Sequence, residues 1–128
     1  MAYVADTVAI IRFMTKHKKL GRSALKIFRE EFHKAKIFVP AFVLVEIMYQ
    51  IEKARIDLDL EALIQQFRSD PKYHIVHLDP EVIRIASKLQ GLELHDRLIA
   101  ATAKHLNLPL LTCDKAIAEN RAIRVIWH

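Results

Sequence analysis

Residues 96–114 read Asp-Arg-Leu-Ile-Ala-Ala-Thr-Ala-Lys-His-Leu-Asn-Leu-Pro-Leu-Leu-Thr-Cys-Asp. The first part places apolar and small residues at helical spacing, so we expect a helix over residues 95–106. Pro109 breaks that helix, and residues 110–112 form a short apolar run that predicts a strand. A helix followed at once by an apolar strand, with an acid at each end of the pair, is typical of an α/β fold.

The rest of the chain continues this alternation of strands and helices. The other expected strands are 3–5, 37–39, 73–78 and 124–127. The other expected helices are 7–14, 23–34 with Ser23 as N-cap, 40–55 with Pro40 in the first turn, 60–68, and 79–91 with Asp79 as N-cap and Gly91 after its end. Strands interleaved with helices imply right-handed crossovers and a mostly parallel sheet. We therefore predict one α/β domain over residues 1–128, with about five strands between two helical layers.

The rare residue types exclude several classes of site. The chain has only two glycines, Gly21 and Gly91, which cannot form either glycine-rich phosphate loop or the turn around a nucleophilic serine. The single Cys113 excludes an intrachain disulfide and a thiolate zinc cluster, and it fits a reducing compartment. The longest apolar run, 37–45, is too short to span a membrane, and the first residues lack a signal-peptide pattern. We expect a cytoplasmic protein.

Four acids occupy positions where a carboxylate needs an explanation. Asp6 and Asp114 each follow an expected strand, and ligands of parallel sheets bind at the carboxyl ends of strands. Glu46 lies in the most apolar segment, and Asp96 heads a helix that continues with small residues. Taken singly, each has a structural alternative: the aspartates as helix caps or first-turn acids, and Glu46 as a surface residue or a partner of Lys53.

The four acids together point to a metal. Oxygen-only ligation is what Mg²⁺ or Mn²⁺ prefers, and without a cation the carboxylates would repel one another. A divalent ion would cancel that repulsion, bridge to a phosphate and activate a water molecule for attack.

These residues carry a resemblance to a known family. Asp6-Thr7 after the first strand, Glu46 within Val43 to Glu46, and the 96–114 stretch resemble the PIN domain, and within it the VapC toxin ribonucleases of toxin–antitoxin pairs. The likeness covers nearly the whole chain, and the 96–114 stretch is its most specific part. It implies a Mg²⁺- or Mn²⁺-dependent endoribonuclease, usually a homodimer, that a small antitoxin protein blocks.

The resemblance also assigns roles to individual residues. Asp6, Asp96 and Asp114 match the aspartates that hold the metal, and Glu46 matches the acid that completes the ligand shell, often through water. Thr7 and Thr112 match hydroxyl residues beside the acids, and such residues orient carboxylates. The chain departs from the family after Asp114, where Lys-Ala-Ile stands in place of a further polar or acidic residue and an aromatic one. The sequence therefore leaves open whether there is a fifth ligand and whether one or two metal ions bind.

The net charge of +5 is unevenly distributed. Residues 12–36 hold nine basic residues against two acidic ones, a net of +7, while the remaining chain sums to −2. This basic segment is either a solvated face or a contact for RNA phosphates, in which case binding would be strongly salt-sensitive. The candidate RNA-binding residues are Arg12, Lys16, Lys18, Lys19 and Arg22.

Other functions fit the sequence less well. A phosphotransferase with Asp6 as nucleophile would have a second acid two residues later, where Val8 stands. A receiver domain needs an acceptor aspartate at a mid-chain strand end, but Glu46 falls inside a helix. His95 could assist catalysis but more often such a residue is exposed and idle. The main alternative to a nuclease is a catalytically silent PIN-like module that binds protein or RNA.

Overall fold

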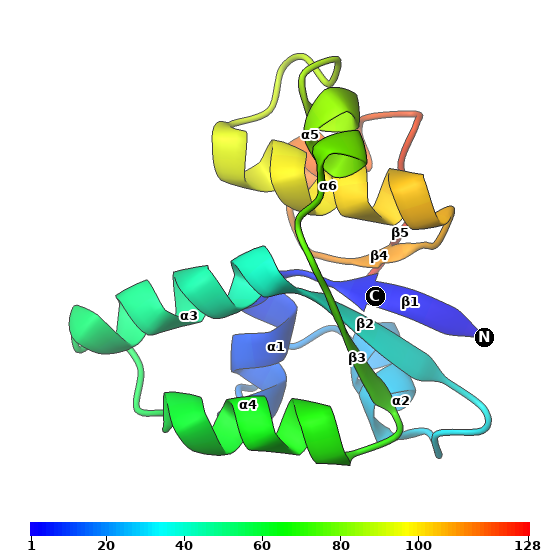
Figure 1. Cartoon of the computed structure of the whole chain (residues 1–128). Helices are drawn as coiled ribbons and strands as arrows, with labels where there is room; N and C mark the ends of the chain where they lie inside the picture. The colour runs from blue at the N-terminus through cyan, green and yellow to red at the C-terminus, as the bar shows by residue number, and fades with distance from the viewer.

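The computed structural model describes all 128 residues and contains a five-stranded sheet in the order β3-β2-β1-β4-β5, with every neighbouring pair parallel (Figure 1). The strands are β1 (Ala2–Ala5), β2 (Lys36–Pro40), β3 (Tyr73–Val76), β4 (Leu110–Leu111) and β5 (Val125–Ile126). The helices are α1 (Thr7–Met14), α2 (Arg22–Arg29), α3 (Ala41–Glu52), α4 (Leu60–Ser69), α5 (Pro80–Ala86), α6 (Leu94–Leu106) and α7 (Lys115–Ala118). The predicted α/β class with a parallel sheet is confirmed.

Two helical layers enclose this sheet. In Figure 1, α5 and α6 lie at the top near β4 and β5, whereas α1, α3 and α4 lie to the left of the sheet and at the lower left, with α2 behind β3. The strand order explains the division, because the chain moves from β1 to β2 and β3 in one direction and later returns across the sheet to β4 and β5. Right-handed crossovers that run in opposite directions must place their helices on opposite faces.

The strand order also creates a switch point between β1 and β4. The chain leaves β1 toward one face and leaves β4 toward the other, so the helices that follow them diverge. The register pairs Val4 with Leu110 and Ala5 with Leu111, which brings the carboxyl ends of these two strands side by side. Open parallel sheets bind their ligands in the crevice at such a point.

A continuous apolar core fixes the two strands that flank the switch point. Val4, Leu110 and Leu111 are fully buried. Above them, α6 presents Ala100 and Ala103, whose small side chains let the helix pack closely on the sheet. No helix of the structure is long and apolar enough to cross a membrane.

Helix α2 differs from the sequence prediction at both ends. Its N-cap is Gly21 rather than Ser23, which lies inside the helix and donates a hydrogen bond to the His128 carbonyl. Only glycine fits at position 21, because an added Cβ would lie 2.0 Å from the Trp127 carbonyl oxygen. The helix ends at Arg29 instead of residue 34. The buried Lys72 ammonium there donates hydrogen bonds to the carbonyls of the last turn, including those of residues 27 and 28 at 2.8 and 2.6 Å.

The structure also differs from the sequence prediction at the boundaries of other helices. Asp79 caps α5 as predicted, but the helix stops at Ala86, and Gly91 lies in a later turn with a φ of +83°. Pro40 belongs to the end of β2 and precedes α3 instead of lying in its first turn, and α3 ends at Glu52 rather than residue 55. The four-residue helix α7 was not predicted, because one turn is too short to show a periodic pattern.

Candidate active site

Asp6 and Asp114 stand at the carboxyl ends of β1 and β4. The Asp6 amide donates to the Leu111 carbonyl at 3.1 Å, so the strand pairing continues to the first acid. Both aspartates cap helices: Asp6 Oδ1 accepts from the Ala9 amide at 2.8 Å, and Asp114 Oδ1 accepts from the Ile117 amide at 3.0 Å. The capping role that the sequence offered as an alternative is real. It also fixes both carboxylates at the switch point.

Glu46 reaches the same place from α3. Its Oε1 accepts a hydrogen bond from the Thr7 hydroxyl, and its Oε2 lies 3.3 Å from His95 Nδ1. The Glu46 side chain is 21% exposed, so these two contacts engage both oxygens of a largely buried carboxylate. The alternative pairing with Lys53 is wrong, because the Lys53 ammonium lies over the Tyr49 ring instead.

Asp96 occupies the first turn of α6, after Glu93 as the N-cap. Its carboxylate takes part in none of the hydrogen bonds or ion pairs of the structure, although the residue is only partly exposed. Asp96 is thus not the helix cap, whereas the alternative position of a first-turn acid is confirmed. Among the four acids, Asp96 is the one for which neither carboxylate oxygen makes a hydrogen bond or ion pair.

All four acids line one cavity of about 150 Å³, together with Thr7, Val8, Ile99 and Cys113. They come from four separate elements at positions 6, 46, 96 and 114. As the side chains stand, no group of three or more Asp, Glu, His or Cys residues is placed to hold a metal ion, and three of the acids are partly engaged by the contacts above. Four oxygen donors around one small cavity still have the chemistry that Mg²⁺ or Mn²⁺ prefers.

Burial and mutual repulsion perturb two of these carboxyls. Burial raises the pKa of Asp6 from 3.8 to about 6; hydrogen bonds from Thr112 and the Ala9 amide oppose the rise, and the charges of Asp96 and Glu46 add to it. Burial also raises the pKa of Asp96 to about 6, with further contributions from the charges of Asp114 and Glu46. The carboxylates therefore interact electrostatically across the cavity, and a cation would relieve this cost.

Three neighbours of the acids are Thr7 and Thr112, which the sequence assigned to the site, and His95, which it did not. Thr7 contacts Glu46 directly, and the Thr112 hydroxyl accepts from the Asp114 amide at 3.1 Å, which suits residues that orient carboxylates. The sequence assigned little weight to His95, yet its Nδ1 lies 3.3 Å from Glu46 Oε2 while its own side chain is 61% exposed. Only its position beside Asp96 could have indicated this contact.

Six of the nine basic residues of 12–36 lie around two other hollows. Arg12, Lys16 and Lys18 line one, Arg22 lines the second, and Lys19 lines neither.

The PIN domain family model matches residues 3–123 of the chain. This match covers nearly the whole α/β fold and includes all four acids at the switch point. The protein belongs to the PIN domain family.

Solved structures with the same fold include several toxin–antitoxin proteins. VapBC2 from Rickettsia felis, solved bound to a DNA fragment from its promoter, has 18% identity and a TM-score of 0.77, with 100% of both chains covered. FitAcB from Neisseria gonorrhoeae has 16% identity and a TM-score of 0.69, covering 97% of this chain and 96% of the other. PAE2754 from Pyrobaculum aerophilum has 20% identity and a TM-score of 0.59, covering 98% and 83%. No curated protein matches the sequence.

Proposed function

We propose that the protein is a metal-dependent endoribonuclease and the toxin of a VapBC-type toxin–antitoxin pair. One observation carries the proposal: four acids from distant parts of the chain line one small cavity at the switch point of the sheet. Membership of the PIN domain family supports a nuclease. The raised pKa values of Asp6 and Asp96 support a cation site, because uncompensated carboxylates crowd one another there.

Asp6, Asp96 and Asp114 would hold Mg²⁺ or Mn²⁺, and Glu46 would complete the shell through a water molecule. Glu46 suits this indirect position because Thr7 and His95 already engage both of its oxygens. When bound, the ion would polarise the scissile phosphate of RNA and lower the pKa of a water molecule for in-line attack. The chain's own part is to keep the aspartates ionised and oriented through the helix-capping amides and the Thr7 and Thr112 hydroxyls.

The partners follow from the same proposal. The similar solved proteins include a toxin–antitoxin complex from Klebsiella pneumoniae and DNA-bound VapBC from Salmonella typhimurium. We expect this chain to bind a cognate antitoxin, to form a homodimer and to act in the cytoplasm on RNA. A silent PIN-like binding module would not need four acids around one cavity, and the position of Asp96 in the first turn of α6 does not explain why it faces three other acids there.

Cleavage of RNA by the purified chain is the direct test. We expect cleavage with Mg²⁺ or Mn²⁺ and none with EDTA. Asp96→Asn should abolish cleavage and lower Mn²⁺ affinity measured by calorimetry. Asp57→Asn should change neither, because Asp57 is an exposed acid between α3 and α4 that does not line the cavity. Robust cleavage in EDTA would refute the metal mechanism. Mn²⁺ binding without cleavage of any RNA would favour the silent module.

A further inference from the structure

A second, larger hollow lies between the end of α1 and α2. Its volume is about 650 Å³, and its wall includes four Lys or Arg side chains and no acid. These are Arg12, Lys16, Lys18 and Arg29. A hollow of this size and charge is suited to an anionic group larger than a single ion.

This hollow continues into a groove along α2. The two share Leu25 and Arg29, and the groove adds Arg22, Lys26 and the acid Glu30. Five of the six Lys and Arg side chains around the two hollows are exposed, and the sixth, Arg12, is partly buried. We call this surface the basic track and define it by Arg12, Lys16, Lys18, Arg22, Lys26 and Arg29.

Arg12 connects the basic track to the carboxylate cavity. Its Nη1 donates to the Lys19 carbonyl at 3.2 Å and lies 3.9 Å from Cys113 Sγ, and its guanidinium lies 5.8 Å from the centre of the Trp127 ring. Cys113 itself lines the carboxylate cavity. The track therefore begins at the edge of the candidate active site, and these contacts hold its first cation in place.

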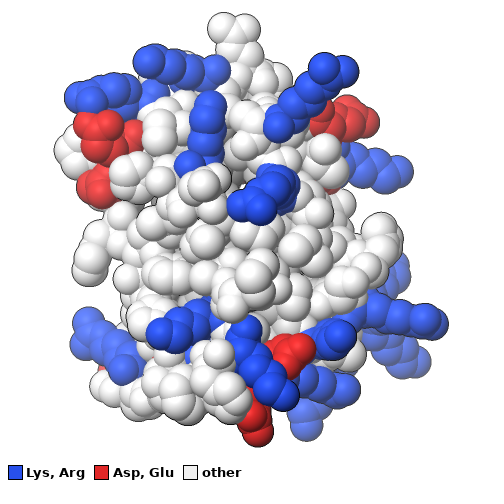
Figure 2. All heavy atoms as spheres, turned by 90° about the vertical axis from the view of Figure 1, so that its right-hand side faces the viewer, with Lys and Arg blue, Asp and Glu red and all other residues white.

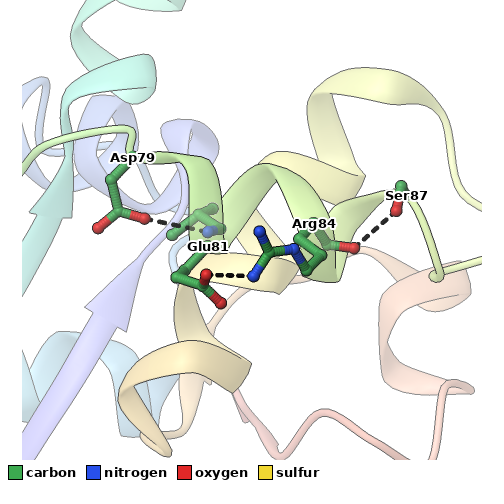
Figure 3. Close-up of polar contacts among 5 residues, drawn as sticks. Asp79, Glu81, Arg84 and Ser87 are labelled. Carbon is green, nitrogen blue, oxygen red and sulfur yellow. Dashed lines mark hydrogen bonds and ion pairs between the residues drawn. The ribbon is translucent and has the colours of Figure 1, made fainter.

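The charges of the track are not neutralised by the protein. The ion pairs of the structure are His33–Glu31, Arg84–Glu81 and His95–Glu46, and none includes a track residue. Arg84 shows the contrast, because it pairs with Glu81 one turn away on α5 (Figure 3). On the face shown in Figure 2, Lys and Arg side chains gather above and below a largely uncharged band. What distinguishes the track is its two joined hollows and its contact with the acid cavity.

We infer that the basic track binds the sugar–phosphate backbone of the RNA on one side of the scissile bond. The inference rests on the proposed nuclease function. If a phosphodiester binds in the carboxylate cavity, the RNA strand must continue outside it, and Arg12 is a cation at the edge of the cavity where the next phosphates could bind. The two hollows extend over the ends of two helices, which suits several successive phosphates. An acidic polypeptide is the competing ligand, but its carboxylates would have to approach the four acids beside Arg12.

The test compares two double variants with the same net charge. Lys16→Gln with Arg29→Gln removes two track cations, and Lys88→Gln with Lys104→Gln removes two exposed lysines of the opposite helical layer. Both are made in the Asp96→Asn chain, so that RNA is bound without being cut. Binding of a fluorescein-labelled single-stranded RNA is followed by anisotropy over a series of KCl concentrations, and thermal melts verify that each variant is folded.

The track variant should bind RNA more weakly and with less salt dependence. Two lost phosphate contacts should reduce the slope of log K against log[KCl] by about 1.4, which corresponds to about 25-fold weaker binding at ~0.1 M salt. The effect should be larger for a long oligonucleotide than for a short one. The control variant should retain the slope of its parent.

Three outcomes would overturn the inference. Equal weakening in both double variants would show that only net charge matters. An unchanged slope in the track variant would place the RNA elsewhere. Loss of binding to a poly-glutamate peptide with RNA binding intact would make the track a polypeptide site. The nuclease proposal is tested separately, because a wild-type chain that cleaves no RNA but binds it through the track refutes only the nuclease.

Discussion

Replacing Asp6 by Asn should make the metal-free protein more stable at neutral pH. The Asp6 side chain is buried, with 7% of the residue exposed, and its pKa is about 6 in the fold against an ordinary value of 3.8. The folded chain therefore holds this proton more tightly than the unfolded chain. The contribution of Asp6 to stability is therefore most favourable below pH 4 and becomes less favourable as pH rises from about 4 to about 6.

The size of the effect follows from the two pKa values. Each pH unit between them is worth 1.36 kcal/mol, so ionised Asp6 costs the fold at most about 3 kcal/mol at pH 7. Asn cannot ionise, yet its amide oxygen can still accept from the Ala9 amide, and Asn is as good an N-cap as Asp. Asp6→Asn should gain up to about 3 kcal/mol at pH 7 and nothing near pH 3.5.

Urea unfolding in EDTA, at pH 3.5 and at pH 7, measures this difference. Asp79→Asn is the matched control, because Asp79 caps α5 through the Val82 amide at 3.1 Å in the same manner but is exposed (Figure 3). That variant should change stability little at either pH. The reasoning is refuted if Asp6→Asn is less stable than the wild type at pH 7, or if its effect is the same at both pH values. Added Mn²⁺ should stabilise the wild type and not Asp6→Asn.

The remaining predictions concern residues that hold α2 in place, the hydroxyl that contacts Glu46, and the pH dependence of metal binding. Gly21→Ala should destabilise by about 1–3 kcal/mol in urea unfolding, because its Cβ would meet the Trp127 carbonyl oxygen at 2.0 Å. Lys72→Met should cost about 1–3 kcal/mol and loosen α2, seen by amide hydrogen exchange, because buried carbonyls lose their donor. Thr7→Val should lower Mn²⁺ affinity about 10-fold or more in calorimetry, because Glu46 loses its hydroxyl donor. Metal affinity should fall as pH drops below about 6, because protons compete for the two aspartates with raised pKa; an affinity that is constant from pH 5 to 7 would contradict this.

Local chemistry explains what the sequence could predict of the fold. Asp79-Pro80-Glu81 predicts a helix start because each residue satisfies a requirement of the first turn, and Asp79 does cap α5. The approach of Asp6 to Asp114 follows from the rule that parallel strands end at one edge, and both line the same cavity. Neither prediction needs knowledge of how distant segments pack.

Tertiary contacts decided the features that the sequence could not predict. Ser23 is the better N-cap residue by local preference, but the approach of Trp127 to Gly21 moves the start of α2. The contacts of Glu46 join α3 to α1 and α6, over separations of 39 and 49 residues. Such contacts depend on the rotation and packing of whole helices, which periodicity along one helix does not fix.

The pairing of β1 with β4 has a consequence for when the site can form. Val4 and Leu110 are partners across more than a hundred residues, so closing this contact requires nearly the whole chain. At elongation rates of about 5–20 residues per second, the ribosome adds Asp114 about 5–20 s after Asp6. The acids cannot share a cavity before that. A growing chain therefore cannot assemble the cavity that the four acids line until residue 114 has left the ribosome.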